Sequence, residues 1–253
     1  MKIAVLGSGG WGTALAMVLL ENGHDVTLWS YSEDESKVLR ETGENPMLKG
    51  VALPETLKLT SDMACVKGCG AVVLATPSFA VRETARKLSA LLEPETILIS
   101  VSKGIEKDTS LTLTQVIASE VGEKFKIVAL SGPSHAEEVG RRVPTTVVAA
   151  SRDQAAAELV QDLFMNPRFR VYASDDVVGV ELAAALKNVI ALSAGVCDGM
   201  GFGDNTKAAL MTRGLSEIAR LGEALGGRKA TFAGLAGVGA LLVTCTSMHS
   251  GHR

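Results

Sequence analysis

Short apolar runs alternate with longer amphipathic stretches along the first part of the chain. Runs such as Lys2–Leu6 and Ala71–Ala75 are typical of strands in a parallel sheet that is covered on both faces. The stretches between them have the spacing of helices. This alternation predicts an α/β fold with a doubly wound, mostly parallel sheet. The predicted strands cover 2–6, 25–29, 71–75, 97–101, 127–130, 146–150 and 169–173, and the predicted helices between them cover 13–20, 32–41, 80–92, 111–121 and 153–164.

The pattern changes near Asp176. Beyond it the strand-like runs stop, and Val177–Cys197 and Thr206–Leu225 have the length and spacing of two long helices joined by a glycine-rich turn. The sequence therefore predicts two domains, one built on the sheet over residues 1–178 and an all-α one over residues 179–253.

Composition narrows the choice of partners. The 253 residues carry a net charge of -3, which gives no reason to expect nucleic acid or an anionic membrane as a partner. The longest apolar run is interrupted by Lys187 and Asn188, so we expect no stable membrane insertion. The cysteines have neither C-x-x-C spacing nor paired histidines, which favours reduced thiols of a cytoplasmic protein and no metal site. They are Cys65, Cys69, Cys197 and Cys245.

The most specific motif is G-x-G-x-x-G at Gly7, Gly9 and Gly12, between the first predicted strand and the first predicted helix. In this context the first glycine allows a tight turn, the second lets a pyrophosphate approach the backbone, and the third lets the helix lie close to the strand. The free N–H groups at the helix start would face the anion. A tight turn without a ligand is the alternative, but the second strand after the helix favours a Rossmann-like dinucleotide site.

The end of the second strand bears on the choice of nucleotide. NAD-preferring domains carry Asp or Glu there, whereas this chain reads Trp29-Ser30-Tyr31-Ser32, with its first carboxylate at Glu33. Ser32 and Glu35 form a predicted capping box, and no Arg is present for a 2′-phosphate. Both NAD and NADP therefore stay open as cofactors.

Three later strands end in polar loops that a parallel sheet would bring to one edge, where ligands bind. The loops are Thr76–Ser78, Ser102–Gly104 and Ser131–Glu138. Lys103 fits either a contact to a carbonyl group or a solvated loop lysine. His135 fits either a proton shuttle or a loop residue oriented by its neighbours.

Lys187 is the sharpest candidate for chemistry. Its neighbours one helical turn away are all apolar: Ala183, Ala184, Ile190 and Ala191. Burial lowers the pKa of a lysine and makes its amine usable as a proton donor or acceptor near neutrality. The alternative is a lysine that extends out of a packed helix to solvent. The chain has no nucleophile elbow, Walker loop or metal spacing, so hydride transfer is the simplest chemistry.

Longer segments support a specific resemblance along the whole chain. They are GSGGWGTALA (7–16), ATPS (75–78), SVSKGIE (100–106), LSGPSHAEEVG (130–140), RVPTTV (142–147), GVELAAALKNVIALSAGVCDGMGFGDNTKAALMTRGLSEIARLG (179–222) and TFAGLAGVG (231–239). In these segments the sequence resembles the bacterial NAD(P)-dependent sn-glycerol-3-phosphate dehydrogenases.

The resemblance implies reversible reduction of dihydroxyacetone phosphate to glycerol 3-phosphate for phospholipid synthesis. It implies that Lys187 accepts the proton in alcohol oxidation and that Lys103 touches both cofactor and substrate, so these two are the expected catalytic residues. Beside the motif glycines, the implied cofactor contacts are Gly10, Trp11, Tyr31, Lys103 and Ala136. The implied substrate contacts are Lys103, Gly132, Ser134, Lys187, Asn188, Thr244 and Ser250. A phosphorylated small molecule is the expected partner, with a homodimer as the expected assembly.

The end of the chain departs from that family. The family has Asp where this chain has Ala240, and Ser-Arg-Asn where this chain reads Ser250-Gly251-His252 before its last residue, Arg253. We therefore expect an incomplete helical domain with a weaker grip on phosphate and with exposed apolar helix faces. Two other functions compete: a dehydrogenase of unphosphorylated hydroxy acids, and a non-catalytic dinucleotide-binding protein.

Overall fold

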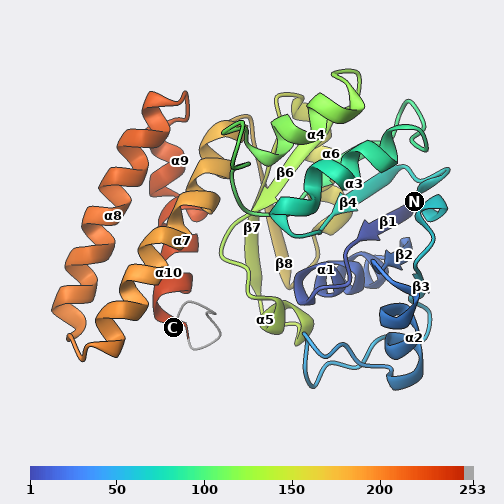
Figure 1. Ribbon diagram of the computed structural model, residues 1–253, viewed down its shortest axis with the longest axis horizontal. Helices are drawn as coiled ribbons and strands as arrows, with labels where there is room; N and C mark the ends of the chain where they lie inside the picture. Colours follow the sequence, from blue (N-terminus) through green and yellow to red (C-terminus); the bar gives the residue numbers. More distant parts are fainter. Residues whose placement is uncertain (248–253) are drawn as a thin grey trace.

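The computed structural model describes residues 1–247 and contains an eight-stranded sheet in the order β3-β2-β1-β4-β5-β6-β7-β8 (Figure 1). All neighbouring strands are parallel except β6 and β7, which pair antiparallel. The strands are β1 Lys2–Leu6, β2 Asp25–Trp29, β3 Lys58–Thr60, β4 Ala71–Leu74, β5 Ile97–Ser100, β6 Ile127–Ser131, β7 Thr145–Ala150 and β8 Phe169–Ser174. The predicted doubly wound, mostly parallel sheet is confirmed.

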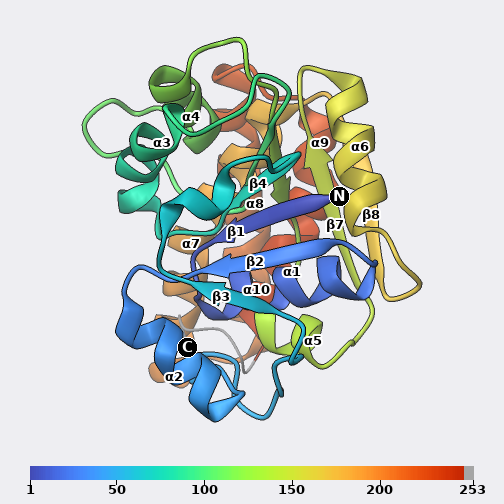
Figure 2. The same cartoon turned by 90° about the vertical axis from the view of Figure 1, so that its right-hand side faces the viewer.

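Helices cover both faces of the sheet, and the helices that follow β8 in the chain contact β6 and β7. They are α1 Gly10–Glu21, α2 Glu33–Thr42, α3 Val81–Ser89, α4 Leu113–Val121, α5 Ala136–Gly140, α6 Gln154–Phe164, α7 Val177–Gly199, α8 Asp204–Ala224, α9 Lys229–Ala233 and α10 Ala240–Thr246. The sequence pattern missed β3, α5, α9 and α10, because three to seven residues are too few to display a period. Figure 2 shows β3 beside β2 at the outer edge of the sheet.

The strands are apolar throughout because each one contributes to two cores. In β1, Ile3 and Val5 belong to the core cluster on one face, while Ala4 and Leu6 belong to the cluster on the other. Helices α1 and α6 pack on the first face, and α3 and α4 pack on the second. Successive side chains of a strand point to opposite faces, so a strand covered on both sides shows no polar positions.

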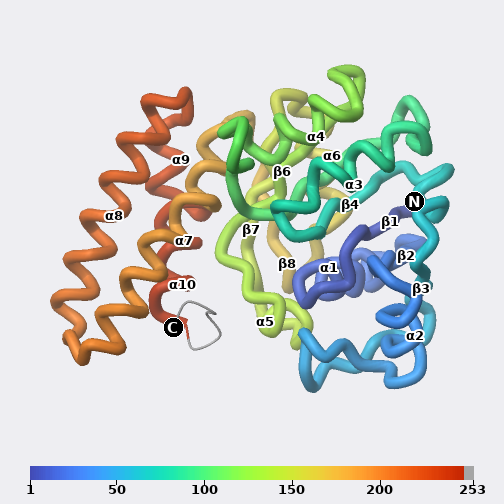
Figure 3. Tube along the Cα trace, viewed as in Figure 1, coloured from blue at the N-terminus to red at the C-terminus, as the bar shows by residue number. Residues whose placement is uncertain are grey.

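After β8 the chain enters the long helix α7, as the tube in Figure 3 shows, and α8 returns beside it. Ala150 of β7 shares a core cluster with Val180 of α7 and Phe232 of α9, so the helical region packs against that strand. The predicted domain division at 178/179 falls in the first turn of α7 and stays a prediction.

One side of α7 is apolar and open to solvent. Val189, Leu192, Val196 and Met200 are more than half exposed, which agrees with the expected exposure of apolar helix faces. Helix α7 is also long and apolar enough to cross a membrane by length and composition alone, with a mean hydropathy of 1.6. This is weak evidence, since about half of its most apolar part is buried in the protein like the core helix of a globular fold.

Candidate functional site

The glycine loop between β1 and α1 has the shape that a dinucleotide needs. Gly7 has a φ of 121°, and a Cβ atom there would lie 2.5 Å from the carbonyl oxygen of Ala75. A Cβ atom on Gly12 would lie 2.0 Å from the carbonyl oxygen of Gly7, so no larger residue fits. At Gly9 a Cβ atom would meet nothing within 4 Å. The backbone at Gly9 is therefore bare and approachable, which fits a bound pyrophosphate.

The start of α1 supplies the charge complement to that shape. Gly9 is the N-cap and gives no side-chain cap, so the first-turn N–H groups of Gly10, Trp11 and Gly12 are available to an anion. The indole nitrogen of Trp11 is buried and has no hydrogen-bond partner among the described residues. A Cβ atom on Gly10 would lie 2.7 Å from the carbonyl oxygen of Met47, which explains a glycine at this position.

Asn45 holds the glycine loop in place through hydrogen bonds. The sequence analysis did not identify this residue. Its side chain is 2% exposed and its amide nitrogen donates to the carbonyl oxygen of Ser8 at 2.8 Å and to the hydroxyl of Thr13 at 2.6 Å. Its amide oxygen accepts from the N–H of Met47 at 2.8 Å. The sequence Glu44-Asn45-Pro46 indicates only a turn. The hydrogen bonds of Asn45 to the glycine loop are seen only in the structure.

The glycine loop lies beside the residues that follow β2, since the hydroxyl of Ser8 contacts Glu35. Tyr31 is 79% exposed and stands edge-on to Trp29, with their ring centroids 6.3 Å apart. Glu33 is engaged by Arg40 and by the Ser61 hydroxyl. The Ser32 hydroxyl caps α2 by accepting from the N–H of Glu35 at 3.3 Å.

The predicted capping box at α2 forms only in part. The carboxylate of Glu35 accepts from the hydroxyl of Ser8 at 3.3 Å, so it reaches toward the glycine loop. Glu35 is therefore a carboxylate beside the nucleotide end of the site. Sequence reasoning assigned it only a structural cap, because the motif fits a capping box without reference to the loop.

The loops after β5 and β6 meet at Lys103. Its amine donates to the hydroxyl of Ser134 at 3.3 Å and to the carbonyl oxygen of Gly132 at 3.5 Å. Burial, and second the charge of Lys187, lower the pKa of Lys103 to about 7. Of the two alternatives for Lys103, the structure therefore shows the carbonyl contact and not the solvated lysine.

Lys187 lies inside the protein and not at its surface. Lys187 is 6% exposed, and its amine donates to the hydroxyl of Thr244 on α10. That hydroxyl donates in turn to the carbonyl oxygen of Ala240 at 2.7 Å. Within residues 1–247 no carboxylate forms an ion pair with this amine. Burial lowers the pKa of Lys187 to about 8, and the nearby Cys245 thiol opposes this in part.

The remaining predicted site residues that the structure describes lie on α5, on α7 and in the loop after β6. Ala136 opens α5, and its Cβ lies 3.5 Å from where a Cβ on Gly10 would stand, so it faces the glycine loop. The Nε2 atom of His135 lies 3.4 Å from the carbonyl oxygen of Val243, which links the loop after β6 to α10. Asn188 follows Lys187 on α7 and is half-buried. Ser250 lies outside the described residues.

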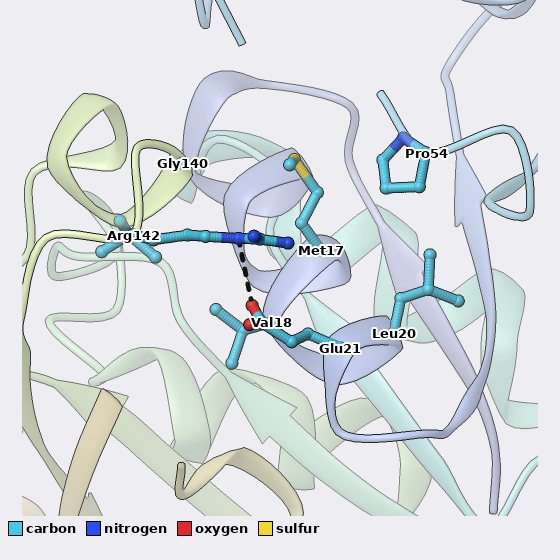
Figure 4. A pocket seen from close by; sticks show the side chains of 8 residues that line it. Met17, Val18, Leu20, Glu21, Pro54, Gly140 and Arg142 are labelled. Carbon is cyan, nitrogen blue, oxygen red and sulfur yellow. Dashed lines mark ion pairs between the residues drawn. The ribbon is translucent and has the colours of Figure 1, made fainter. Parts of the chain in front are cut away.

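A hollow on another face of α1 contains none of the predicted site residues (Figure 4). Its lining is mostly apolar, and an ion pair between Arg142 and Glu21, with 3.5 Å between the nitrogen and the oxygen, crosses it. Among the residues that the structure describes, no group of His, Cys, Asp or Glu is arranged to hold a metal ion. The glycine loop and the two amines are therefore the candidate site.

Comparisons with known proteins identify the family of the chain. Family models described as the N-terminus and the C-terminus of NAD-dependent glycerol-3-phosphate dehydrogenase match residues 2–157 and 176–253. The chain is 56% identical to glycerol-3-phosphate dehydrogenase [NAD(P)+] of Moorella thermoacetica, over all of this chain and 75% of the relative. It is 54% identical to the same enzyme of Desulfitobacterium hafniense, over 98% of this chain and 71% of the relative.

Solved structures give the same result. The crystal structure of glycerol-3-phosphate dehydrogenase from Coxiella burnetii matches with a TM-score of 0.95 and 39% identity, over all of this chain and 78% of that chain. D-mandelate dehydrogenase matches with a TM-score of 0.66 at 15% identity, a likeness of fold alone.

Proposed function

Because the chain belongs to the NAD-dependent glycerol-3-phosphate dehydrogenase family, we propose that it interconverts dihydroxyacetone phosphate and sn-glycerol 3-phosphate with NAD or NADP. Such an enzyme supplies the precursor of glycerophospholipids. One observation of the structure carries the proposal: the buried amine of Lys187 and the half-buried amine of Lys103 come from separate parts of the chain, and the charge of Lys187 contributes to lowering the pKa of Lys103.

The dinucleotide would lie on the glycine loop. Gly7 and Gly12 shape the turn, Gly9 leaves room for the pyrophosphate, and the N–H groups of Gly10 and Trp11 face its charge. We place Tyr31 at the adenosine end, and Ala136 and Lys103 along the remainder. When bound, the nicotinamide supplies or accepts the hydride.

In this proposal Lys187 accepts and donates the proton of the reaction. In alcohol oxidation its neutral amine takes the proton of the substrate hydroxyl, and in ketone reduction the ammonium returns that proton to the carbonyl oxygen. A pKa of about 8 leaves both forms populated near neutral pH. The hydroxyl of Thr244 accepts from the amine and so fixes its direction.

Two neighbouring cations favour an anionic substrate. We propose that Lys103 and Lys187 bind the phosphorylated ketone, with Gly132, Ser134, Asn188, Thr244 and Ser250 around it. The loop contacts of Lys103 to Gly132 and Ser134 support this, because they already bring those groups together.

The test is turnover by the purified chain. It should oxidise NADH or NADPH with dihydroxyacetone phosphate, and Lys187→Ala should abolish this while calorimetry still detects cofactor binding. Lys229→Ala, at an exposed position of α9, is the matched control and should retain both. Turnover with an unphosphorylated oxo acid but none with dihydroxyacetone phosphate would favour the hydroxy-acid alternative. Cofactor binding without any turnover would favour the non-catalytic one.

We also propose a cytoplasmic enzyme that forms a homodimer. The free thiols of all four cysteines support a reducing compartment, and the exposed apolar side of α7 supports self-association. Light scattering on a sizing column should give twice the mass of one chain, and Leu192→Glu should shift it to that of one chain. A wild-type chain of single mass at micromolar concentration would contradict the dimer.

A further inference from the structure

A buried carboxylate of α7 has no part in the mechanism above. Glu181 is 8% exposed and lies on the same helix as Lys187. Its two oxygens accept from Thr114 of α4, whose N–H donates at 2.9 Å and whose hydroxyl donates at 2.5 Å. The Thr112 side chain and the Leu113 N–H also act on this carboxylate as donors. Burial raises the pKa of Glu181, and these donors oppose that rise. The carboxylate is therefore fully engaged across the gap between α7 and α4.

Thr114 lies at the base of the loop that carries Lys103. This loop leaves β5 and ends where α4 begins, and Ile105 pairs with Thr112 across it as an antiparallel bridge. Thr112 is the N-cap of α4, and Thr114 lies in the first turn of that helix. The bridge joins the two sides of the loop close to Lys103. The bridge therefore couples the position of the first turn of α4 to that of the Lys103 side of the loop.

The outer side of the same loop is attached to a different helix. Arg82 of α3 holds the carboxylate of Glu106 with two parallel hydrogen bonds of 2.7 Å and 2.6 Å. Arg82 also bonds Glu120 of α4. The loop, α3 and α4 are thus tied together, and Glu181 is a direct polar link from them to the helix of Lys187.

We propose that Glu181 is a positioning residue for the proposed reaction, whose hydrogen bonds to Thr114 set the separation of the Lys103 and Lys187 amines. The inference rests on the proposed function only in taking these two amines as the site. The carboxylate itself contacts neither of them in the hydrogen bonds it makes. It acts through the two backbone elements that it joins.

A merely structural role makes a different prediction. A carboxylate at the start of α4 also stabilises that helix through its free N–H groups and dipole. In that case its removal lowers stability and leaves the two amines unchanged. Asp176 provides the matched control, since it is a second buried carboxylate at α7 that accepts from a backbone N–H, of Gly179, and a threonine hydroxyl, of Thr231. It has no link to the Lys103 loop among these bonds.

The experiment compares Glu181→Leu with Asp176→Leu in the full chain. The free-amine fraction of Lys103 is followed against pH by competitive acetylation with acetic anhydride and mass spectrometry, and kcat and KM for dihydroxyacetone phosphate are measured in parallel. Loss of the link separates the amines and admits water, so the labelling midpoint of Lys103 should rise by about one pH unit, a tenfold loss of free amine below it. We expect kcat to fall about tenfold with cofactor affinity unchanged.

The controls separate position from charge and from stability. Loss of the negative charge alone would lower the Lys103 midpoint, so only a change of position raises it. Glu181→Gln, which can still accept from the Thr114 N–H, should restore most of the wild-type behaviour. Asp176→Leu should lower the melting temperature and leave the Lys103 midpoint unchanged.

Three results would overturn the proposal: an unchanged midpoint and kcat in folded Glu181→Leu, a lowered midpoint, or an equal rise in Asp176→Leu. If Glu181→Leu does not fold, Thr114→Val removes only the hydroxyl bond and carries the same test. The labelling needs no turnover. A wild type inactive on dihydroxyacetone phosphate would therefore refute the proposed function without deciding the role of Glu181.

Discussion

Replacing Lys187 by Met should stabilise the protein while abolishing its activity. Burial moves the pKa of Lys187 from its ordinary 10.5 to about 8. At about 1.4 kcal/mol for each unit, the folded state then loses about 3 kcal/mol at neutral pH relative to an uncharged side chain. Methionine has a similar length and fills irregular space well. The Thr244 hydroxyl keeps its own acceptor, the carbonyl oxygen of Ala240, so the substitution leaves no buried donor unpaired.

The sign of the pH dependence provides a second check. The folded-state pKa is lowered, so at a pH below about 8 the amine is charged in both states and the full cost applies. As the pH rises toward 10.5 the unfolded chain also loses its proton and the cost disappears. The advantage of Lys187→Met should therefore be largest at neutral pH and shrink in alkaline solution.

Urea unfolding measures this difference at about pH 7 and about pH 10, with Lys229→Met, at an exposed position of α9, as the control. We expect a gain of about 2–3 kcal/mol at the lower pH, or roughly 5–10 °C in melting temperature for a chain of this size. A variant that is less stable than wild type at neutral pH would refute the argument, because it would show that the buried amine contributes more through its hydrogen bond than its desolvation costs.

Three further predictions concern the same site. Ala240→Asp should raise the pKa of Lys187 by about one to three units, because an opposite charge beside an amine favours its charged form, and the pH profile of alcohol oxidation should shift upward; an unchanged profile would place position 240 away from the amine. Gly9→Ala should fold normally and lose at least about tenfold in cofactor affinity, measured by fluorescence titration. Gly12→Ala should instead lower the free energy of unfolding by about 1–3 kcal/mol, and equal behaviour of the two variants would contradict their assigned roles. Glu35→Gln should raise kcat/KM with NADPH relative to NADH, since its carboxylate lies beside the glycine loop where a 2′-phosphate would be repelled; an unchanged ratio would exclude it as the nucleotide-reading acid.

The sequence predicted the parts of the fold that repeat a period over many residues. The strands of the sheet centre are continuous apolar runs because both of their faces are covered, and this pattern is legible without any contact information. The apolar helical neighbours of Lys187 left two alternatives, a buried lysine and a lysine that reaches solvent, and the structure shows the buried one. The roles of these residues in catalysis stay predictions.

Long-range pairings were beyond sequence reasoning. Nothing near Lys187 in the chain indicates that Thr244 would receive its hydrogen bond, and nothing near Asn45 indicates the backbone of Ser8. The sequence analysis gave Glu181 no role, because its partner Thr114 lies on α4, in a distant part of the chain. Each pairing depends on how the helices pack on the sheet, which a single sequence does not display.

The charged residues buried at α7 argue that function and not stability accounts for Lys187. Within the described residues, the buried charged side chains are Asp176, Glu181 and Lys187. The two carboxylates each accept from a backbone N–H and a threonine hydroxyl, so their desolvation is offset by several donors. Among residues 1–247 the ammonium has one hydroxyl partner and no carboxylate partner, although it has three protons to donate. The carboxylates of this helix thus have their hydrogen-bond donors, whereas the Lys187 amine has N–H groups left to donate. A substrate oxygen would bind at those N–H groups.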